Sequence, residues 1–109
     1  MKLRFVWAVV LAGALGACGS EGGQHADVEP IPLDLAQKGY EQKCALCHGN
    51  DGKLGRTGAP DLTTSKMNPA ERERIIRYGK GLMPPQKDVL NDAEIAGIAA
   101  YLDTFLAAE

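Results

Sequence analysis

Three segments of the chain combine helical spacing of apolar residues with the residue types that start helices. Asp34 precedes the first segment with Gln37 three positions later, and Asn68 and Asn91 precede the others with a glutamate at that position. A capping residue followed three positions later by Glu or Gln marks a helix N-terminus. In the last segment the apolar residues are Ile95, Ile98, Ala99, Leu102, Phe105 and Leu106. Their spacing predicts a single buried helical face.

Two stretches rich in glycine and proline separate these segments, one from Gly49 to Ser65 and one from Gly79 to Leu90. The middle helix is expected to run to about Tyr78. No segment alternates apolar and polar residues with a period of two, so no strand is predicted. Loops of this length are uncommon in a small domain unless a large group lies between them. The pattern indicates an all-α domain over residues 33–109.

The first seventeen residues have the features of a cleaved export signal. Lys2 and Arg4 form a positive region, and an apolar run of eleven residues follows at 5–15. A membrane-spanning helix needs about twenty apolar residues, so this run is too short for a permanent span.

The sequence Leu15-Gly16-Ala17-Cys18 resembles the lipobox of bacterial lipoproteins. The resemblance implies that residues 1–17 are removed and that Cys18 carries a diacylglyceryl group, which anchors the chain in the periplasm or on the outer side of the bacterial membrane. The alternative is an ordinary signal peptide with an incidental cysteine. Residues 18–32 are rich in Gly, Ser, Glu and Pro and indicate a flexible tether, in which His25 is expected to be solvated rather than a ligand.

Composition and charge narrow the function of the folded part. Fourteen of the first eighteen residues are apolar, whereas only 35 of the following 91 are. This low share of apolar residues indicates that a non-protein group completes the core. The net charge of −2 with interleaved signs gives no basis for binding nucleic acid and reveals no docking face.

Cys44-Ala45-Leu46-Cys47-His48 has the spacing of a c-type haem attachment site. On a helix, two thiols three residues apart can each add to a vinyl group on one side of a porphyrin, and the next imidazole then points at the iron. A thioredoxin-like pair would need a βαβ context that is missing. A zinc site would need His25 as its fourth ligand, and a Cys44–Cys47 disulfide would leave His48 unexplained.

With these residues the chain resembles the small class I (mitochondrial-type) bacterial cytochromes c from Leu33 to Leu106. The motifs that carry the resemblance are Tyr40 before the first haem cysteine, Cys44-Ala-Leu-Cys47-His48-Gly49, Gly58-Ala59-Pro60-Asp61-Leu62, Gly81-Leu82-Met83-Pro84, and a final helix with Tyr101. The resemblance implies the cytochrome c fold, with three to four helices around one covalently bound haem c and its iron.

The resemblance also implies the roles of individual residues. His48 and Met83 would be the axial ligands, and the Pro60 carbonyl would accept the other ring N–H of His48. The family often has glycine where this chain has Ala36, so the crossing of the terminal helices is expected to be wider or to use Gly97.

The choice of Met83 also rests on its neighbours. Only Met67 and Met83 remain after cleavage, and Met83 precedes Pro84-Pro85, which restrict the backbone. Met67 precedes a helix cap, where apolar residues commonly pack. The alternative for Met83 is a plain core methionine. Arg77 and Tyr78 are candidate hydrogen-bond donors to a haem propionate.

His/Met ligation leaves no open position for substrate or dioxygen and favours ferrous iron. We therefore expect a one-electron carrier without enzymatic activity or small-molecule substrate, which exchanges electrons with redox protein donors and acceptors. Two alternatives remain: a haem enzyme or gas sensor with a labile methionine, and a fixed haem subunit of a larger oxidase or reductase. Without haem the chain is expected to be largely unfolded.

Overall fold

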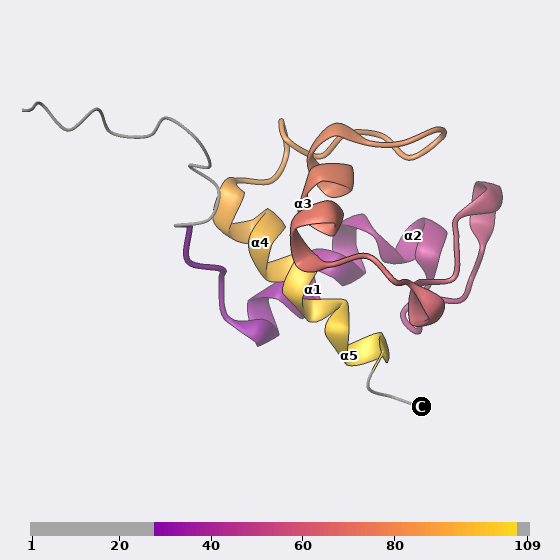
Figure 1. Ribbon diagram of the computed structural model, residues 1–109, viewed down its shortest axis with the longest axis horizontal. Helices are drawn as coiled ribbons and strands as arrows, with labels where there is room; N and C mark the ends of the chain where they lie inside the picture. Colours follow the sequence, from indigo (N-terminus) through magenta and orange to yellow (C-terminus); the bar gives the residue numbers. More distant parts are fainter. Residues whose placement is uncertain (1–27, 107–109) are drawn as a thin grey trace, which may run out of the picture.

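The computed structural model describes residues 28–106, and helices joined by loops make up that range (Figure 1). Its α-helices are α1 (Leu33–Lys43), α2 (Ala45–His48), α3 (Pro69–Tyr78), α4 (Asp92–Tyr101) and α5 (Asp103–Leu106), and its 3-10 helices are η1 (Arg56–Gly58) and η2 (Leu62–Thr64). Between residues 28 and 106 there is no strand, only an isolated β-bridge between Lys80 and Met83. The all-α prediction is confirmed.

Several sequence-based predictions concern residues outside this range. The export signal, Cys18 and His25 precede the described residues, as does most of the tether. Among residues 28–106, no helix has both the length and the apolar content that a membrane crossing requires.

Two of the three predicted helix starts are confirmed. The Asn68 side chain accepts a hydrogen bond from the Glu71 amide, and the Glu71 carboxylate accepts one from the Asn68 amide. Asn91 and Glu94 form the same reciprocal pair at the start of α4. Each pair satisfies two amides at a helix start.

The predicted cap at Asp34 is wrong. Helix α1 begins two residues earlier than predicted, after Pro32, whose carbonyl accepts a hydrogen bond from the Ala36 amide at 2.9 Å. Asp34 therefore lies inside the first turn, where its negative charge interacts favourably with the helix dipole. The Gln37 side chain donates instead to Glu41 at 2.9 Å.

Two short helices, α2 and α5, raise the number of α-helices above the three to four that were expected. Cys44, with φ −114°, interrupts the helical backbone between α1 and α2, and Leu102 separates α4 from α5. Helices α1 and α2 are thus nearly continuous, as are α4 and α5, and the helical segments follow one another along the chain as predicted. Figure 1 shows α5 continuing the direction of α4.

Helix α4 forms the centre of the fold because it packs against both α1 and α3 (Figure 1). The buried core consists of Ala36, Tyr40, Ile76, Leu90, Ile95, Ile98, Ala99, Leu102 and Phe105. Tyr40, Tyr101 and Phe105 form an aromatic group with ring centroids 5.2–5.4 Å apart, a spacing at which aromatic pairs attract. The core therefore joins the first and last helices.

The close contact between α1 and α4 uses Gly39 rather than Gly97. A methyl group added at Gly39 would lie 3.2 Å from Ile98 Cδ1, whereas one added at Gly97 would lie 2.5 Å from Ile31 Cγ1. Gly97 therefore accommodates the chain that enters α1, where the Ile31 amide donates to the Ala93 carbonyl at 3.0 Å.

Candidate cofactor site

A cavity of about 670 Å³ opens between the helices and the two long loops. Its size is that of a site for a cofactor or large ligand. Its walls are mainly apolar, and include Tyr40, Leu46, Ala59, Pro60, Leu62, Met67, Ile75, Ile76, Leu82, Met83, Pro84, Ile98 and Leu102. The two glycine- and proline-rich loops predicted to enclose a large group do line this cavity.

The cysteine–histidine segment lies on one wall, held by helical hydrogen bonds. The Cys44 amide donates to the Tyr40 carbonyl at 2.8 Å, and the His48 amide donates to the Cys44 carbonyl at 3.0 Å. The Tyr40 hydroxyl donates to the Gly49 carbonyl at 2.6 Å and ties α1 to the residue after His48. The aromatic residue four positions before the first cysteine thus anchors the segment.

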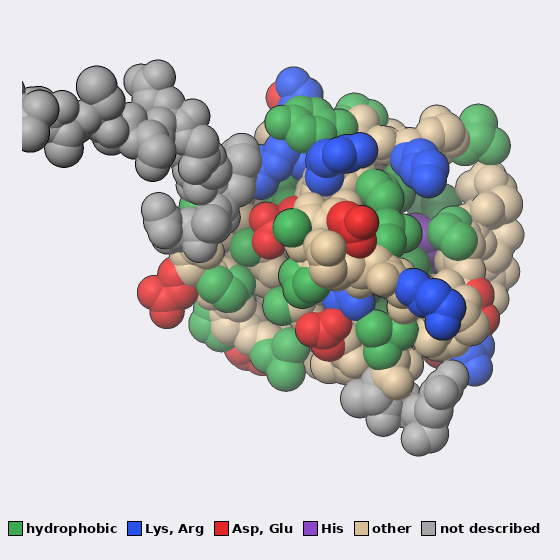
Figure 2. Space-filling model, in the orientation of Figure 1, with side chains coloured by type: hydrophobic (Ala, Val, Ile, Leu, Met, Phe, Trp, Pro, Cys, Tyr) green, Lys and Arg blue, Asp and Glu red, His purple; other side chains and the backbone are tan. Residues whose placement is uncertain are grey.

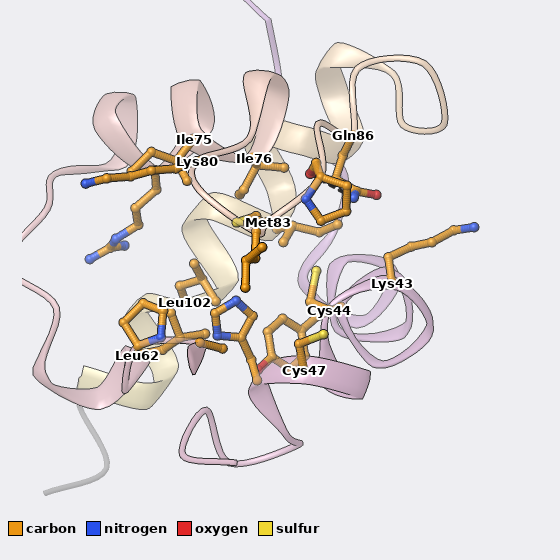
Figure 3. A pocket seen from close by; sticks show the side chains of 18 of the residues that line it. Lys43, Cys44, Cys47, Leu62, Ile75, Ile76, Lys80, Met83, Gln86 and Leu102 are labelled. Atoms are coloured by element: carbon orange, nitrogen blue, oxygen red, sulfur yellow. Dashed lines mark hydrogen bonds between the residues drawn. The ribbon is translucent and has the colours of Figure 1, made fainter. Parts of the chain in front are cut away.

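Both thiols of this segment are free and partly buried at the cavity (Figure 3). Burial raises the pKa of the Cys44 thiol to about 11, and the neighbouring Cys47 adds to the rise. Cys44 is therefore a neutral thiol at pH 7. The Thr57 hydroxyl lies 3.9 Å from Cys47 Sγ and covers it from the following loop.

The His48 imidazole is buried, with 8% of its surface exposed. Burial lowers its pKa, and the nearby Pro60 carbonyl opposes that change. Nδ1 makes no hydrogen bond of normal geometry to any described residue. Pro60 thus lies beside the imidazole, and the hydrogen bond between them stays a prediction. A neutral imidazole is the form that binds metals.

Both candidate methionines line the cavity, but their backbones are held differently. The Met83 amide donates to the Lys80 carbonyl at 3.0 Å, and the Lys80 amide donates to the Met83 carbonyl at 3.1 Å. Figure 3 shows Met83 at the cavity together with Cys44 and Cys47. Met67, in contrast, donates its amide to the Ser65 hydroxyl at 3.3 Å just before α3.

The residues proposed to meet a propionate are wrong in position. Arg77 is buried against Asp92, with which it forms an ion pair, and Tyr78 is 59% exposed. Neither lines the cavity. The buried arginine that does line it is Arg72, which sequence reasoning missed. The available signal was its place one turn before Ile76, on the face of α3 that turns inward.

The donor set fits covalently bound haem. Two thiols, a buried neutral imidazole and a thioether surround one mainly apolar cavity, and these are the groups that attach haem c and bind its iron. Among residues 28–106, no three His, Cys, Asp or Glu side chains converge on a common metal position. The residues that could hold the cofactor are Cys44, Cys47, His48 and Met83.

Comparisons with known proteins agree with this fit. The family model of cytochrome c oxidase, cbb3-type, subunit III matches residues 32–102. Cytochrome c-551 of Bacillus subtilis (strain 168) is 33% identical over 109 residues, which cover 94% of this chain and 90% of the relative. A solved structure, the KustC0563 c-type cytochrome, superimposes with a TM-score of 0.60 at 25% identity, covering 64% of this chain and 95% of that one.

A larger relative matches over only part of its length. The menaquinol:cytochrome c reductase cytochrome c subunit of the same Bacillus strain is 34% identical over 74 residues, which cover 64% of this chain and 29% of the relative. The chain thus spans less than a third of that protein. Family, fold and relatives agree with the resemblance first seen in the sequence, and this chain belongs to the cytochrome c family as a small class I member, a family whose cofactor is covalently bound haem c with its iron.

Proposed function

We propose that this chain is a one-electron carrier with one haem c attached through Cys44 and Cys47 and with His48 and Met83 as axial ligands. The observation that carries the proposal is the convergence of these four side chains on one cavity. Bound haem iron supplies a reversible one-electron couple. Two protein ligands leave no position for a substrate, so the protein is not an enzyme and has no small-molecule substrate.

The surrounding residues support the ligands. Burial favours the neutral form of His48, and we expect the adjacent Pro60 carbonyl to accept a hydrogen bond from Nδ1–H and so fix the ring tautomer. The paired hydrogen bonds between Lys80 and Met83 fix the backbone of the second ligand. Fixed ligands suit electron transfer, because little then has to reorganise when the iron changes its oxidation state.

The mouth of the cavity suits contact with a partner protein. Leu46 and Leu82 line the cavity and are 68% and 82% exposed. The cavity lining also includes Lys43 and Lys80, and no Asp or Glu. Figure 2 shows basic side chains gathered over α3 and the adjoining loop, next to exposed hydrophobic ones. We infer redox protein donors and acceptors that present acidic surfaces, in line with the reductase subunit among the relatives.

The N-terminal part of the proposal is a lipid anchor. Residues 1–17 form the signal peptide, Cys18 carries the lipid, residues 18–32 are the tether and residues 33–109 the cytochrome domain. The match to cytochrome c-551 covers 94% of the chain, so it includes part of the segment before residue 28. The anchored domain lies in the periplasm or on the outer side of the bacterial membrane.

Carbon monoxide binding tests the carrier. We expect the ferrous wild-type protein to bind CO slowly or not at all, because Met83 occupies the second axial position. Rapid CO binding would favour a gas sensor or haem enzyme and contradict the proposal. Purification of the protein alone from its native membrane supports a free carrier, whereas isolation only as a stoichiometric subunit of an oxidase or reductase contradicts it.

The mass of the intact mature protein tests the anchor. We expect one haem increment and one diacylglyceryl increment on a chain that begins at Cys18. A chain cleaved elsewhere, or a Cys18 without lipid, would overturn the anchor and leave the carrier standing.

A further inference from the structure

The chain that enters α1 is fixed to α4 over residues 28–32, which we call the strap. The Ile31 amide donates to the Ala93 carbonyl at 3.0 Å, and Ile31 packs against the buried core. Pro30 and Pro32 flank Ile31 and have no N–H, so the one backbone donor of these three residues is satisfied by α4. The two prolines also restrict the backbone on either side, which makes the strap stiff.

A notch over Gly97 of α4 receives the strap. Gly97 is buried, and a methyl group added there would lie 2.5 Å from Ile31 Cγ1 and 3.2 Å from both the amide nitrogen and the carbonyl oxygen of Ile31. Two of these three contacts are to backbone, so the rotation of one side chain does not relieve them. A side chain at position 97 would therefore displace the strap as a whole.

The strap and the mouth of the cavity lie on opposite sides of the domain. The strap joins the N-terminal end of α1, whereas Cys44 at the other end lines the cavity, and the eleven residues of the helix span about 16 Å. Leu46 and Leu82 line the mouth and are exposed. Figure 1 shows residues 28–32, in indigo, at the left of the domain and α2, which carries Leu46, at the right.

The strap limits the length of chain that links the lipid to the domain. Val28 follows Cys18 by ten residues, which reach about 35 Å when fully extended. A domain of this size has a radius of gyration of about 12 Å, equivalent to a sphere about 30 Å across. To bring the mouth to the bilayer, the chain has to pass a quarter of the way around this sphere and then descend one radius, about 40 Å in all. A chain free as far as Leu33 would extend to about 50 Å.

We propose that the strap keeps the mouth of the cavity away from the bilayer to which the chain is anchored. This inference rests on the proposed function, which places a lipid on Cys18. The strapped chain is too short for the mouth to meet the membrane surface, and a chain released from α4 is long enough. The partner that fits this arrangement is a redox protein whose docking face projects from the membrane into the aqueous phase.

The competing explanation is that the strap only completes the packing of α4. Both explanations predict that the Ile31 amide is protected from hydrogen exchange and that displacing the strap costs stability. They differ in how well a reductant confined to the bilayer reaches the haem, compared with a reductant in water.

The test uses the acylated holoprotein on phosphatidylcholine vesicles, whose neutral headgroups do not attract the lysines that line the cavity. Decamethylferrocene partitions into the bilayer and gives one electron to ferric haem, and ascorbate is the aqueous reductant. Three proteins are compared: wild type, Gly97→Ala, and a variant with about fifteen Gly and Ser residues inserted between Ala26 and Asp27 as a flexible extension. The insertion precedes the strap and leaves the sequence of residues 28–106 unchanged.

The quantity compared is the ratio of the decamethylferrocene rate to the ascorbate rate, which cancels any change in the haem site itself. We expect this ratio to be about tenfold higher with the insertion than in wild type, because a linker that cannot span two sites gives an effective concentration near zero. Gly97→Ala is expected to lie between them, with an Ile31 amide that has lost its protection. Equal ratios in wild type and the insertion variant overturn the inference.

A wild-type ratio in Gly97→Ala, when its Ile31 amide is unprotected, also overturns the inference, as does a wild-type Ile31 amide that exchanges freely. If Gly97→Ala does not fold or keeps the amide protected, Ile31→Ser takes its place, because it removes the apolar contact and leaves the notch empty. Wild-type protein that does not float with the vesicles overturns the lipid anchor itself, which separates the two failures.

Discussion

Gly79 is the residue on which the position of Met83 depends most directly. Its φ of 74° and ψ of 173° lie in a region that only glycine occupies readily. A methyl group added there would lie 2.4 Å from the Met83 carbonyl oxygen and 2.9 Å from the Pro85 nitrogen. Both contacts are to backbone, so no side chain can rotate to relieve them. Gly79→Ala should therefore push the Met83 loop outward.

The cost of this change follows from the geometry. Backbone strain in this region amounts to about 1–3 kcal/mol. Moving the loop also breaks the two hydrogen bonds between Lys80 and Met83, each worth about 1 kcal/mol. We expect Gly79→Ala to lower the free energy of unfolding of the holoprotein by about 3–5 kcal/mol. The ferric protein with methionine bound to iron has a weak near-red absorption band, and Gly79→Ala should weaken this near-red band as well.

Gly81→Ala is the matched control in the same loop. Gly81 also has a positive φ, 57°, but nothing lies within 4 Å of an added methyl group. Only the left-handed backbone is penalised, by about 1–2 kcal/mol, and the near-red band should be retained. Denaturant unfolding and the ferric absorption spectrum of both variants decide the matter. Equal losses of stability with the band kept in both would refute the steric argument.

Three further changes test other parts of the structure. Tyr40→Phe removes the hydroxyl that donates to Gly49 at 2.6 Å and should destabilise the holoprotein by about 1–3 kcal/mol in denaturant unfolding, with haem retained; an unchanged midpoint contradicts this. Asn91→Ala removes the cap of α4 and should cost about 1 kcal/mol, whereas Asn91→Asp should cost less in the same assay. The double variant Cys44→Ser/Cys47→Ser should lack native-like helical circular dichroism, because few aromatic residues complete the core without haem. A cooperative helical melt of that variant would show that the protein core suffices.

Local signals predicted the parts of the fold that depend on neighbouring residues. The caps at Asn68 and Asn91 hold because each pairs with a glutamate in its own first turn. The predicted start of the first helix was wrong because Pro32, with its fixed φ, precedes Asp34 by two residues and caps the helix in its place. The residue types alone do not show which of two nearby residues caps the helix.

Within the candidate site, too, residues that are neighbours in the sequence were predictable and residues that depend on distant partners were not. The cysteine–histidine motif is contiguous, so the sequence alone predicted that its side chains lie together. The sequence could not show which arginine lines the cavity, because Arg72 and Arg77 lie five residues apart on one short helix and both are buried. What distinguishes them is a partner far along the chain: Asp92 for Arg77, and Asp103 for Arg72.

The basic face near the cavity also depends on the fold. Lys43 and Lys80 are far apart in the sequence, and the fold brings them to one cavity that has no acidic lining residue. The order of charges along the chain therefore does not reveal that the folded cavity is lined by lysines and by no acidic residue.

The ferric absorption spectra of Met83→Leu and Met67→Leu test whether Met83 is the second axial ligand. Both methionines line the cavity, so the two variants make the same chemical change in the same surroundings. We expect a weak near-red methionine–iron band in the wild type, its loss in Met83→Leu and its retention in Met67→Leu. A wild-type protein without the band, or a band that disappears with Met67 and survives the loss of Met83, would contradict it.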